Sequence, residues 1–123
     1  MQTTDYVSTL FEGRNNPEKV TVAFTMAVQA LKKGHSATLI LMVNAVELGR
    51  PGAAEGLDIG KPFEPVPALL DSFVALGGRV AVCSSCMIHN GMQPGDIAPG
   101  YEIITGADVV DLLMAAKGSL QIS

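Results

Sequence analysis

The sequence predicts an α/β domain built on a mostly parallel, five-stranded sheet. Two observations support this prediction. Short apolar segments with strand character alternate with longer segments whose apolar residues recur at helical spacing, as in a series of β-α-β units. The chain has 123 residues, of which 48% are apolar, and this suits one folded domain with a sizeable core. No linker or internal repeat divides it, so residues 1–123 are expected to form a single domain.

The first strand and the first helix follow from local signals. The strand is predicted at Asp5–Phe11. Asn16 has the character of a helix N-cap, and Pro17 suits the first helical position. Apolar residues then recur at helical spacing as far as Leu31. Gly34 follows two lysines that suit the negative end of the helix dipole, so it is expected to end the helix.

The next β-α unit contains the most irregular part of the chain. Ala37–Val43 is almost entirely apolar and predicts a strand buried on both faces, followed by a short helical piece at Ala45–Leu48. Gly49–Pro67 contains four glycines and four prolines, so it cannot be regular throughout. Such a segment is typical of a functional lid or a disordered loop. A second helix is predicted at Val66–Leu76, ended by two glycines.

The same alternation continues to the last residues. The predicted elements are a third strand Arg79–Cys83, a short helix Ser84–Asn90, a loop Gln93–Gly100, a fourth strand Tyr101–Ile104, a helix from Thr105 or Gly106 to about Lys117, and a final strand Ser119–Ile122.

Charge and hydropathy exclude several function classes. The net charge is −4 with no basic run, which argues against nucleic-acid binding. The longest apolar stretch, Ala37–Val43, is far too short to span a bilayer, and the first residues lack a signal-peptide pattern. A cytoplasmic location is therefore expected. Charged residues make up only 16% of the chain, below the roughly 25% typical of soluble domains, so part of the surface is expected to be buried against another copy or a partner.

The carboxyl ends of the predicted strands indicate where a site would form. Ligands bind parallel sheets outside these ends, which here carry Glu12, Arg14, Asn44 and the run Cys83–Cys86. Glu12 and Arg14 suit a solvated loop, although Arg14 could hold an anionic sulfur species near the cysteines. The Gly/Pro-rich segment leaves from the same side and could cover the site. It lacks the helix start that follows directly on a phosphate-binding loop, and no cofactor is expected.

Cys83 and Cys86 are the only cysteines, and they flank the junction between a predicted strand and a predicted helix. A thiol at a helix start faces the positive end of the helix dipole, which favours the reactive thiolate. The alternative is a small buried hydrophobic residue, because free cysteine is among the most buried residue types. In a reducing compartment the pair is expected to be free thiols, although the spacing allows a reversible disulfide.

Two further interpretations of this pair stay open. A thioredoxin-like site is disfavoured, because the pair follows a late strand and no proline separates the cysteines. A metal site would add His89 to the two cysteines, but structural zinc usually takes four ligands in two separated pairs. His89 could instead help to deprotonate a thiol, with Ser84 as a further supporting residue.

The order and spacing of these elements resemble the DsrE/DsrF-like family, which includes the sulfur-relay subunits TusB, TusC and TusD. The resemblance rests on the first helix closed by Lys32-Lys33-Gly34-His35, the strand ending at Cys83 with Gly91 eight residues later, and the tail from Tyr101 to Asp108 followed by an apolar helix and a short strand. It implies a three-layer α/β/α fold assembled as homotrimers or homohexamers. It also implies that Cys83, at the end of the third strand, accepts and passes on persulfide sulfur.

Two functional hypotheses follow. The first is a sulfur carrier or sulfurtransferase in which Cys83 exchanges sulfur with donor and acceptor proteins, while Cys86 resolves the persulfide. The second is a non-catalytic oligomeric binding module whose cysteines are core or interface residues. A Cys-x-x-Cys redox or metal-binding protein is a weaker third possibility.

Overall fold

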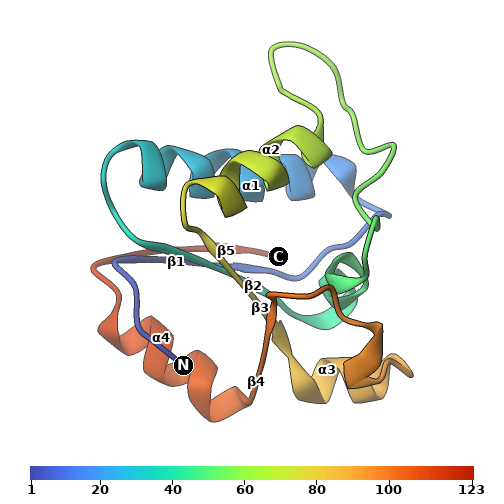
Figure 1. The fold of residues 1–123 in the computed structure, drawn as a ribbon, viewed down its shortest axis with the longest axis vertical. Coiled ribbons are helices and arrows are strands. Elements are labelled where there is room, and N and C mark those ends of the chain that lie inside the picture. Colours follow the sequence, from blue (N-terminus) through green and yellow to red (C-terminus); the bar gives the residue numbers. More distant parts are fainter.

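The computed structural model describes all residues, 1–123, and contains a five-stranded parallel sheet in the order β4-β3-β2-β1-β5 (Figure 1). The strands are β1 (Tyr6–Leu10), β2 (Ala37–Leu41), β3 (Arg79–Cys83), β4 (Glu102–Ile104) and β5 (Gly118–Ile122). The helices are α1 (Pro17–Lys32), α2 (Val66–Ala75), α3 (Ser84–His89) and α4 (Gly106–Ala115), with 3-10 segments η1 (Val43–Gly49) and η2 (Pro94–Asp96). The predicted α/β class and the five strands are confirmed.

The helices cover both faces of the sheet, which makes the predicted three layers. Helices α1 and α2 lie together on one face, whereas α4 lies on the other and α3 sits beyond the end of β3 (Figure 1). The chain adds β2, β3 and β4 outward from β1 and then returns to the opposite edge to form β5. Because parallel crossovers are right-handed, this reversal of direction places α4 on the face opposite to α1 and α2.

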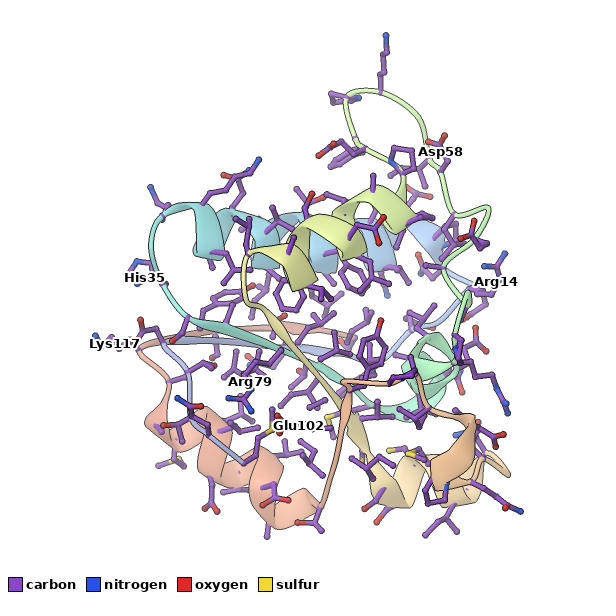
Figure 2. All side chains as sticks on the ribbon, viewed as in Figure 1. Arg14, His35, Asp58, Arg79, Glu102 and Lys117 are labelled. Atoms are coloured by element: carbon purple, nitrogen blue, oxygen red, sulfur yellow. The ribbon has the colours of Figure 1, made fainter.

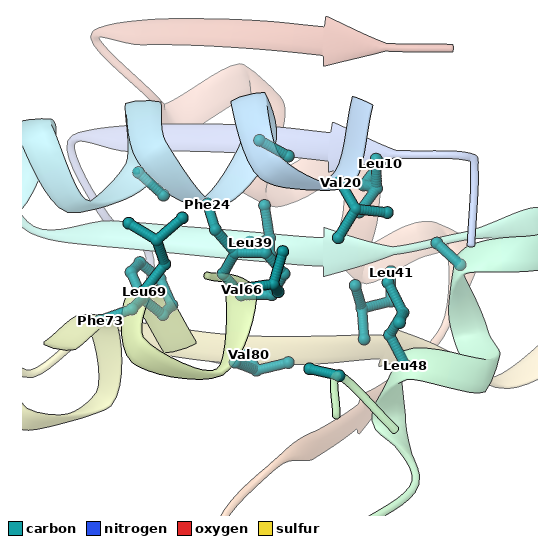
Figure 3. Close-up of a cluster of buried hydrophobic side chains, with 14 of the residues drawn as sticks. Leu10, Val20, Phe24, Leu39, Leu41, Leu48, Val66, Leu69, Phe73 and Val80 are labelled. Atoms are coloured by element: carbon teal, nitrogen blue, oxygen red, sulfur yellow. The ribbon is translucent and has the colours of Figure 1, made fainter. Parts of the chain in front are cut away.

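The larger core lies between the sheet and the pair α1 and α2 (Figure 3). Leu39, Leu41 and Val80 point into it from the central strands. Phe24 of α1 and Phe73 of α2 meet edge to face, with ring centroids 6.3 Å apart. Burying each such side chain contributes about 1.5–3 kcal/mol, so this face supplies most of the hydrophobic stabilisation.

A smaller core lies under α4. It combines one residue from each of four strands with two from the helix: Val7, Ile40, Ala81, Ile104, Val109 and Leu112. Because side chains alternate along a strand, the buried central strands β2 and β3 serve both cores at once. All five residues of β2 are buried, as expected for the continuous apolar run in the sequence.

The predicted element boundaries differ from the observed ones by at most two residues. The Asn16 side chain accepts a hydrogen bond from Lys19 N at 3.2 Å and caps α1, as predicted. Gly34, with φ +89°, ends the helix, and the following N–H donates back to the carbonyl of Ala30. Helix α4 ends at Ala115 rather than near Lys117, because Lys117 N donates to the carbonyl of Asp5 and already leads into β5.

The Gly/Pro-rich segment follows a defined path. Ala54 and Leu57 are buried in the larger core, and Val66 N donates to the carbonyl of Leu57 at 2.9 Å. The tip of the segment rises past α2, at the end of the molecule opposite to α3 (Figure 1). It therefore does not cover the end of β3, contrary to the expectation that it could close over the cysteines. None of the helices combines the length and the apolar character that a bilayer crossing requires.

Candidate functional site

Cys83 is the last residue of β3 and the N-cap of α3. Its neighbour across the sheet is Ile104 of β4, and its side chain is only 4% exposed. The strand brings the residue to the carboxyl edge of the sheet, where the sequence predicted a site. The thiol accepts no capping hydrogen bond from α3, and this helix has only six residues. Activation by the helix start therefore rests on the weak dipole of a very short helix.

Cys86 is the third residue of α3 and is half-buried. It packs against the larger core, and its sulfur lies close to the sulfur of Cys83. Both cysteines are free thiols. Burial raises the pKa of the Cys86 thiol above its ordinary value, and the neighbouring Cys83 sulfur acts in the same direction. The nearby backbone of Val43 acts in the opposite direction and lowers the pKa of the Cys86 thiol.

Two residues beside the thiols were not predicted from the sequence. Val43, just beyond β2, has a left-handed backbone with φ +54°. The side-chain amide of Asn90 donates to the carbonyl of Cys86 at 2.7 Å and lies 3.4 Å from the carbonyl of Val43. The only available signal was Asn90-Gly91, which reads as an ordinary helix end. A β-branched residue gives no warning of a left-handed turn, because its side chain disfavours one.

Arg14 has a structural role in this arrangement. Its guanidinium donates to the carbonyls of Ala53 and Glu55 at 2.6 and 2.8 Å, and its backbone N–H donates to Glu47 Oε1 at 2.7 Å. The guanidinium bonds fasten the Gly/Pro-rich segment to the loop after β1, and the bond to Glu47 fastens η1 to the same loop. Figure 2 shows Arg14 at the edge of the molecule, at the end opposite to His35. The guanidinium is thus occupied by the loop, and no contact with Cys83 supports the idea that it holds a sulfur anion.

Glu12 and Asn44 also lie at the carboxyl edge of the sheet, and their bonds are local. Glu12 Oε2 accepts a hydrogen bond from Asn15 Nδ2 at 3.0 Å. The N–H of Asn44 donates to the carbonyl of Phe11 at 3.2 Å and joins the start of η1 to the end of β1. These contacts shape the edge of the sheet without bringing either side chain to the thiols.

Ser84 and His89 sit at the two ends of α3. Ser84 is half-buried at the first helical position, and His89 is exposed at the last one. Neither side chain makes a hydrogen bond within the protein. No three His, Cys, Asp or Glu side chains come together as metal ligands, so Cys83, Cys86 and His89 do not form the metal site considered from their spacing.

The comparisons with known proteins agree with this architecture. The YchN protein from E. coli has a TM-score of 0.75 and 20% identity over 98% of this chain and 99% of its own. A conserved protein of unknown function from Bacteroides thetaiotaomicron, BT1422, has a TM-score of 0.66 and 17% identity over 96% and 95%. The protein of unknown function MTH1491 from Methanobacterium thermoautotrophicum has a TM-score of 0.65 and 13% identity over 94% and 96%.

At these identities the three structures support the fold alone. No curated protein matches the sequence significantly. The sequence model of the DsrE/DsrF-like family matches residues 6–121, which is nearly the whole chain. The chain therefore belongs to the DsrE/DsrF-like family.

Proposed function

We propose that the protein is a sulfur carrier that holds persulfide sulfur on Cys83. The observation that carries the proposal is the pair of adjacent free thiols at the carboxyl edge of β3, where a parallel sheet forms its sites. The family to which the chain belongs is associated with sulfur relay. A cytoplasmic location fits the proposal, since a reducing compartment keeps both thiols free.

The proposed reaction is a thiol exchange. The Cys83 thiolate attacks the outer sulfur of a donor persulfide, R–S–SH, forming Cys83–S–SH and releasing the donor thiolate, R–S⁻. An acceptor thiolate then attacks the outer sulfur of Cys83–S–SH, takes it as a new persulfide and restores the Cys83 thiolate. The oxidation level of the transferred sulfur does not change, so no cofactor is required.

Cys86 provides a second fate for the same sulfur. Its thiolate can attack the inner sulfur of Cys83–S–SH, which forms a Cys83–Cys86 disulfide and releases sulfide. The position of Cys86 one helical turn away, with its sulfur beside that of Cys83, supports this role. An external thiol must then reduce the disulfide before another cycle.

Intact mass spectrometry tests the proposal. The reduced protein is incubated with a small persulfide, freed of donor and weighed. Wild type is expected to gain the mass of one sulfur, Cys83→Ser none, and Cys86→Ser one sulfur with a longer lifetime. Equal loading of Cys83→Ser and wild type would contradict the assignment to Cys83, and no loading of wild type would contradict sulfur carriage altogether.

A second candidate function is a non-catalytic oligomeric binding module. The burial of Cys83, 4% exposed, favours it, because buried cysteines in apolar surroundings are usually inert. Native labelling with a thiol reagent separates the two functions. Slow labelling of both cysteines in the folded protein, with fast labelling after denaturation, supports the binding module, whereas reaction of either thiol at the rate of a free cysteine supports sulfur carriage.

Protein partners are part of the proposal. Ile88 of α3, next to the thiols, is 77% exposed, and an exposed apolar residue suits contact with a donor or acceptor protein.

On α4, Val110 and Met114 are 58% and 81% exposed. We propose that α4 contributes to a homotrimer or homohexamer, and light scattering of the purified protein measures this directly.

A further inference from the structure

A surface cavity of about 420 Å³ lies at the amino edge of the sheet, between the last turns of α1 and the starts of β1 and β5. Met26, Ala30 and Lys33 line it from the region of the helix, and Tyr6 and Gly118 line it from the strands. The two thiols lie at the carboxyl edge, so the length of the strands separates them from this cavity. Its volume is in the range of small-molecule sites, and the proposed sulfur chemistry does not use it.

The cavity exists because β5 begins with a glycine. Gly118 lies directly beside Tyr6 in the parallel pairing of β5 with β1, and residues paired in this way point to the same face of the sheet. Tyr6 packs against the larger core, on the face that α1 covers, so a side chain at residue 118 would point toward the same helix. A Cβ at this position would meet no atom within 4 Å. The space that a side chain would fill is therefore open, and Tyr6 is only half-buried.

The residues around the cavity carry more positive than negative charge. Lys33, His35 and Lys117 surround it, and Asp5 is its only carboxylate. The Asp5 oxygens lie 3.6 Å from His35 Nδ1 and 3.6 Å from Lys117 Nζ, and Figure 2 shows His35 and Lys117 at the same end of the molecule. Lys33 forms no ion pair. In a chain of net charge −4, this is a local cationic site with one ammonium left free.

We propose that this cavity binds a small organic carboxylate with an apolar body. The apolar body lies against Tyr6 and Met26, and the carboxylate pairs with the Lys33 ammonium. Met26 is 45% exposed although it is apolar, so covering it removes apolar surface from water. A carboxylate is favoured over a neutral or cationic group, because hydrogen bonds between an ammonium and a carboxylate are among the stronger ones. This binding is independent of the thiols and of sulfur transfer.

An NMR titration of the whole chain with 4-phenylbutyrate tests the inference. The probe joins one carboxylate to an apolar ring, and a ligand of this size is expected to bind with a dissociation constant on the order of 1 mM. Saturable shifts are expected at the amides of Tyr6 and Gly118 and at the Met26 methyl group. 4-Phenylbutylamine, which has the same body and an ammonium group, should cause no saturable shift there. Equal binding of the amine, or carboxylate shifts that centre on other residues, overturns the inference.

A charge variant tests the role assigned to Lys33. Lys33→Gln should raise the dissociation constant of 4-phenylbutyrate about threefold, as expected for the loss of an ion pair at the surface. Both lysines at the end of α1 are exposed, so neither substitution threatens the fold. Lys32→Gln is the matched control, because it removes the same charge next in the chain but outside the cavity, and it should leave binding unchanged. A dissociation constant that is the same in Lys33→Gln and in wild type overturns the inference.

A second variant closes the cavity. Gly118→Leu places a side chain in the open space and should abolish the shifts at Tyr6 and Met26. It should fold, because Gly118 has no positive φ and a Cβ there meets no neighbour. Ser119→Leu is the matched control, since it adds the same side chain one residue later, on the opposite face of the sheet, and it should bind the probe as wild type does. Undiminished binding by folded Gly118→Leu also overturns the inference.

Discussion

Gly13, in the loop after β1, lies against η1, and replacing this glycine should be costly. Gly13 is buried. A Cβ at this position would lie 2.5 Å from Glu47 Oε1 and 2.8 Å from the backbone oxygen of Asn44. The carboxylate of Glu47 is held by the N–H of Arg14, so neither neighbour can withdraw freely. Gly13→Ala therefore has to displace the start of η1, the segment that contacts α3.

The magnitude follows from the cost of overpacking, which is about 1–3 kcal/mol for an added methyl group in a filled site. For a domain of this size, about 2 kcal/mol lowers the midpoint of thermal unfolding by roughly 5–12 °C. Circular dichroism during heating measures this shift. The double variant Gly13→Ala/Glu47→Ala should recover part of the lost thermal stability, because the clash with the Glu47 carboxylate is removed. The recovery should be incomplete, because the clash with the backbone oxygen of Asn44 remains.

Gly106→Ala is the matched control for this prediction. Gly106 is the first residue of α4, and a Cβ there would have no neighbour within 4 Å. Alanine also favours helix over glycine by up to about 1 kcal/mol, so this variant should unfold at the same temperature or higher. If Gly13→Ala melted within a degree or two of wild type, the argument from the close contact with η1 would be refuted.

Three other predictions concern separate parts of the molecule. Phe73→Ala should lower the free energy of unfolding by about 3–5 kcal/mol in a denaturant titration, because Phe73 is fully buried; a loss below about 1 kcal/mol would contradict this. Asp5→Asn should lower stability above about pH 5, and the difference from wild type should vanish on acidification, as measured by thermal unfolding across pH. A hydrogen bond from the N–H of Ser36 lowers the pKa of Asp5 in the folded protein, so the stability that the Asp5 carboxylate contributes is lost as the carboxylate becomes protonated. A difference in stability between variant and wild type that stays constant with pH would contradict this prediction. Ile88→Glu should slow sulfur uptake from a protein-bound persulfide several-fold but not from a small persulfide, and equal slowing with both donors would exclude a docking role.

Local signals made most of the fold predictable. Asn16, Pro17 and Gly34 mark the ends of α1 through capping chemistry that depends only on neighbouring residues. The apolar run Ala37–Val43 indicated a buried central strand, and β2 is buried along its whole length. The strand order could not be predicted in this way, because the passage of the chain from β4 to the far edge of the sheet depends on tertiary packing.

The candidate site was predictable only in part. Cys83 was expected at the carboxyl edge of the sheet because a strand ends and a helix starts there, and the structure places it there. The partners of Arg14 lie about forty residues along the chain in an irregular segment, beyond the reach of any local pattern. The turn at Val43 runs against the preference of its own residue type, and its contact with Asn90 joins residues 47 apart in the sequence, so no local pattern could predict it.

The pairing of β5 with β1 has a consequence for how this protein folds. Tyr6 lies beside Gly118, so the first strand of the chain is flanked by the last one, more than a hundred residues later. Until β5 docks, one side of β1 exposes unpaired backbone groups that can template pairing with another molecule. A ribosome-bound or truncated chain lacking β5 would therefore be the species most prone to aggregation, and closing this edge is a slow, long-range step that completes the sheet.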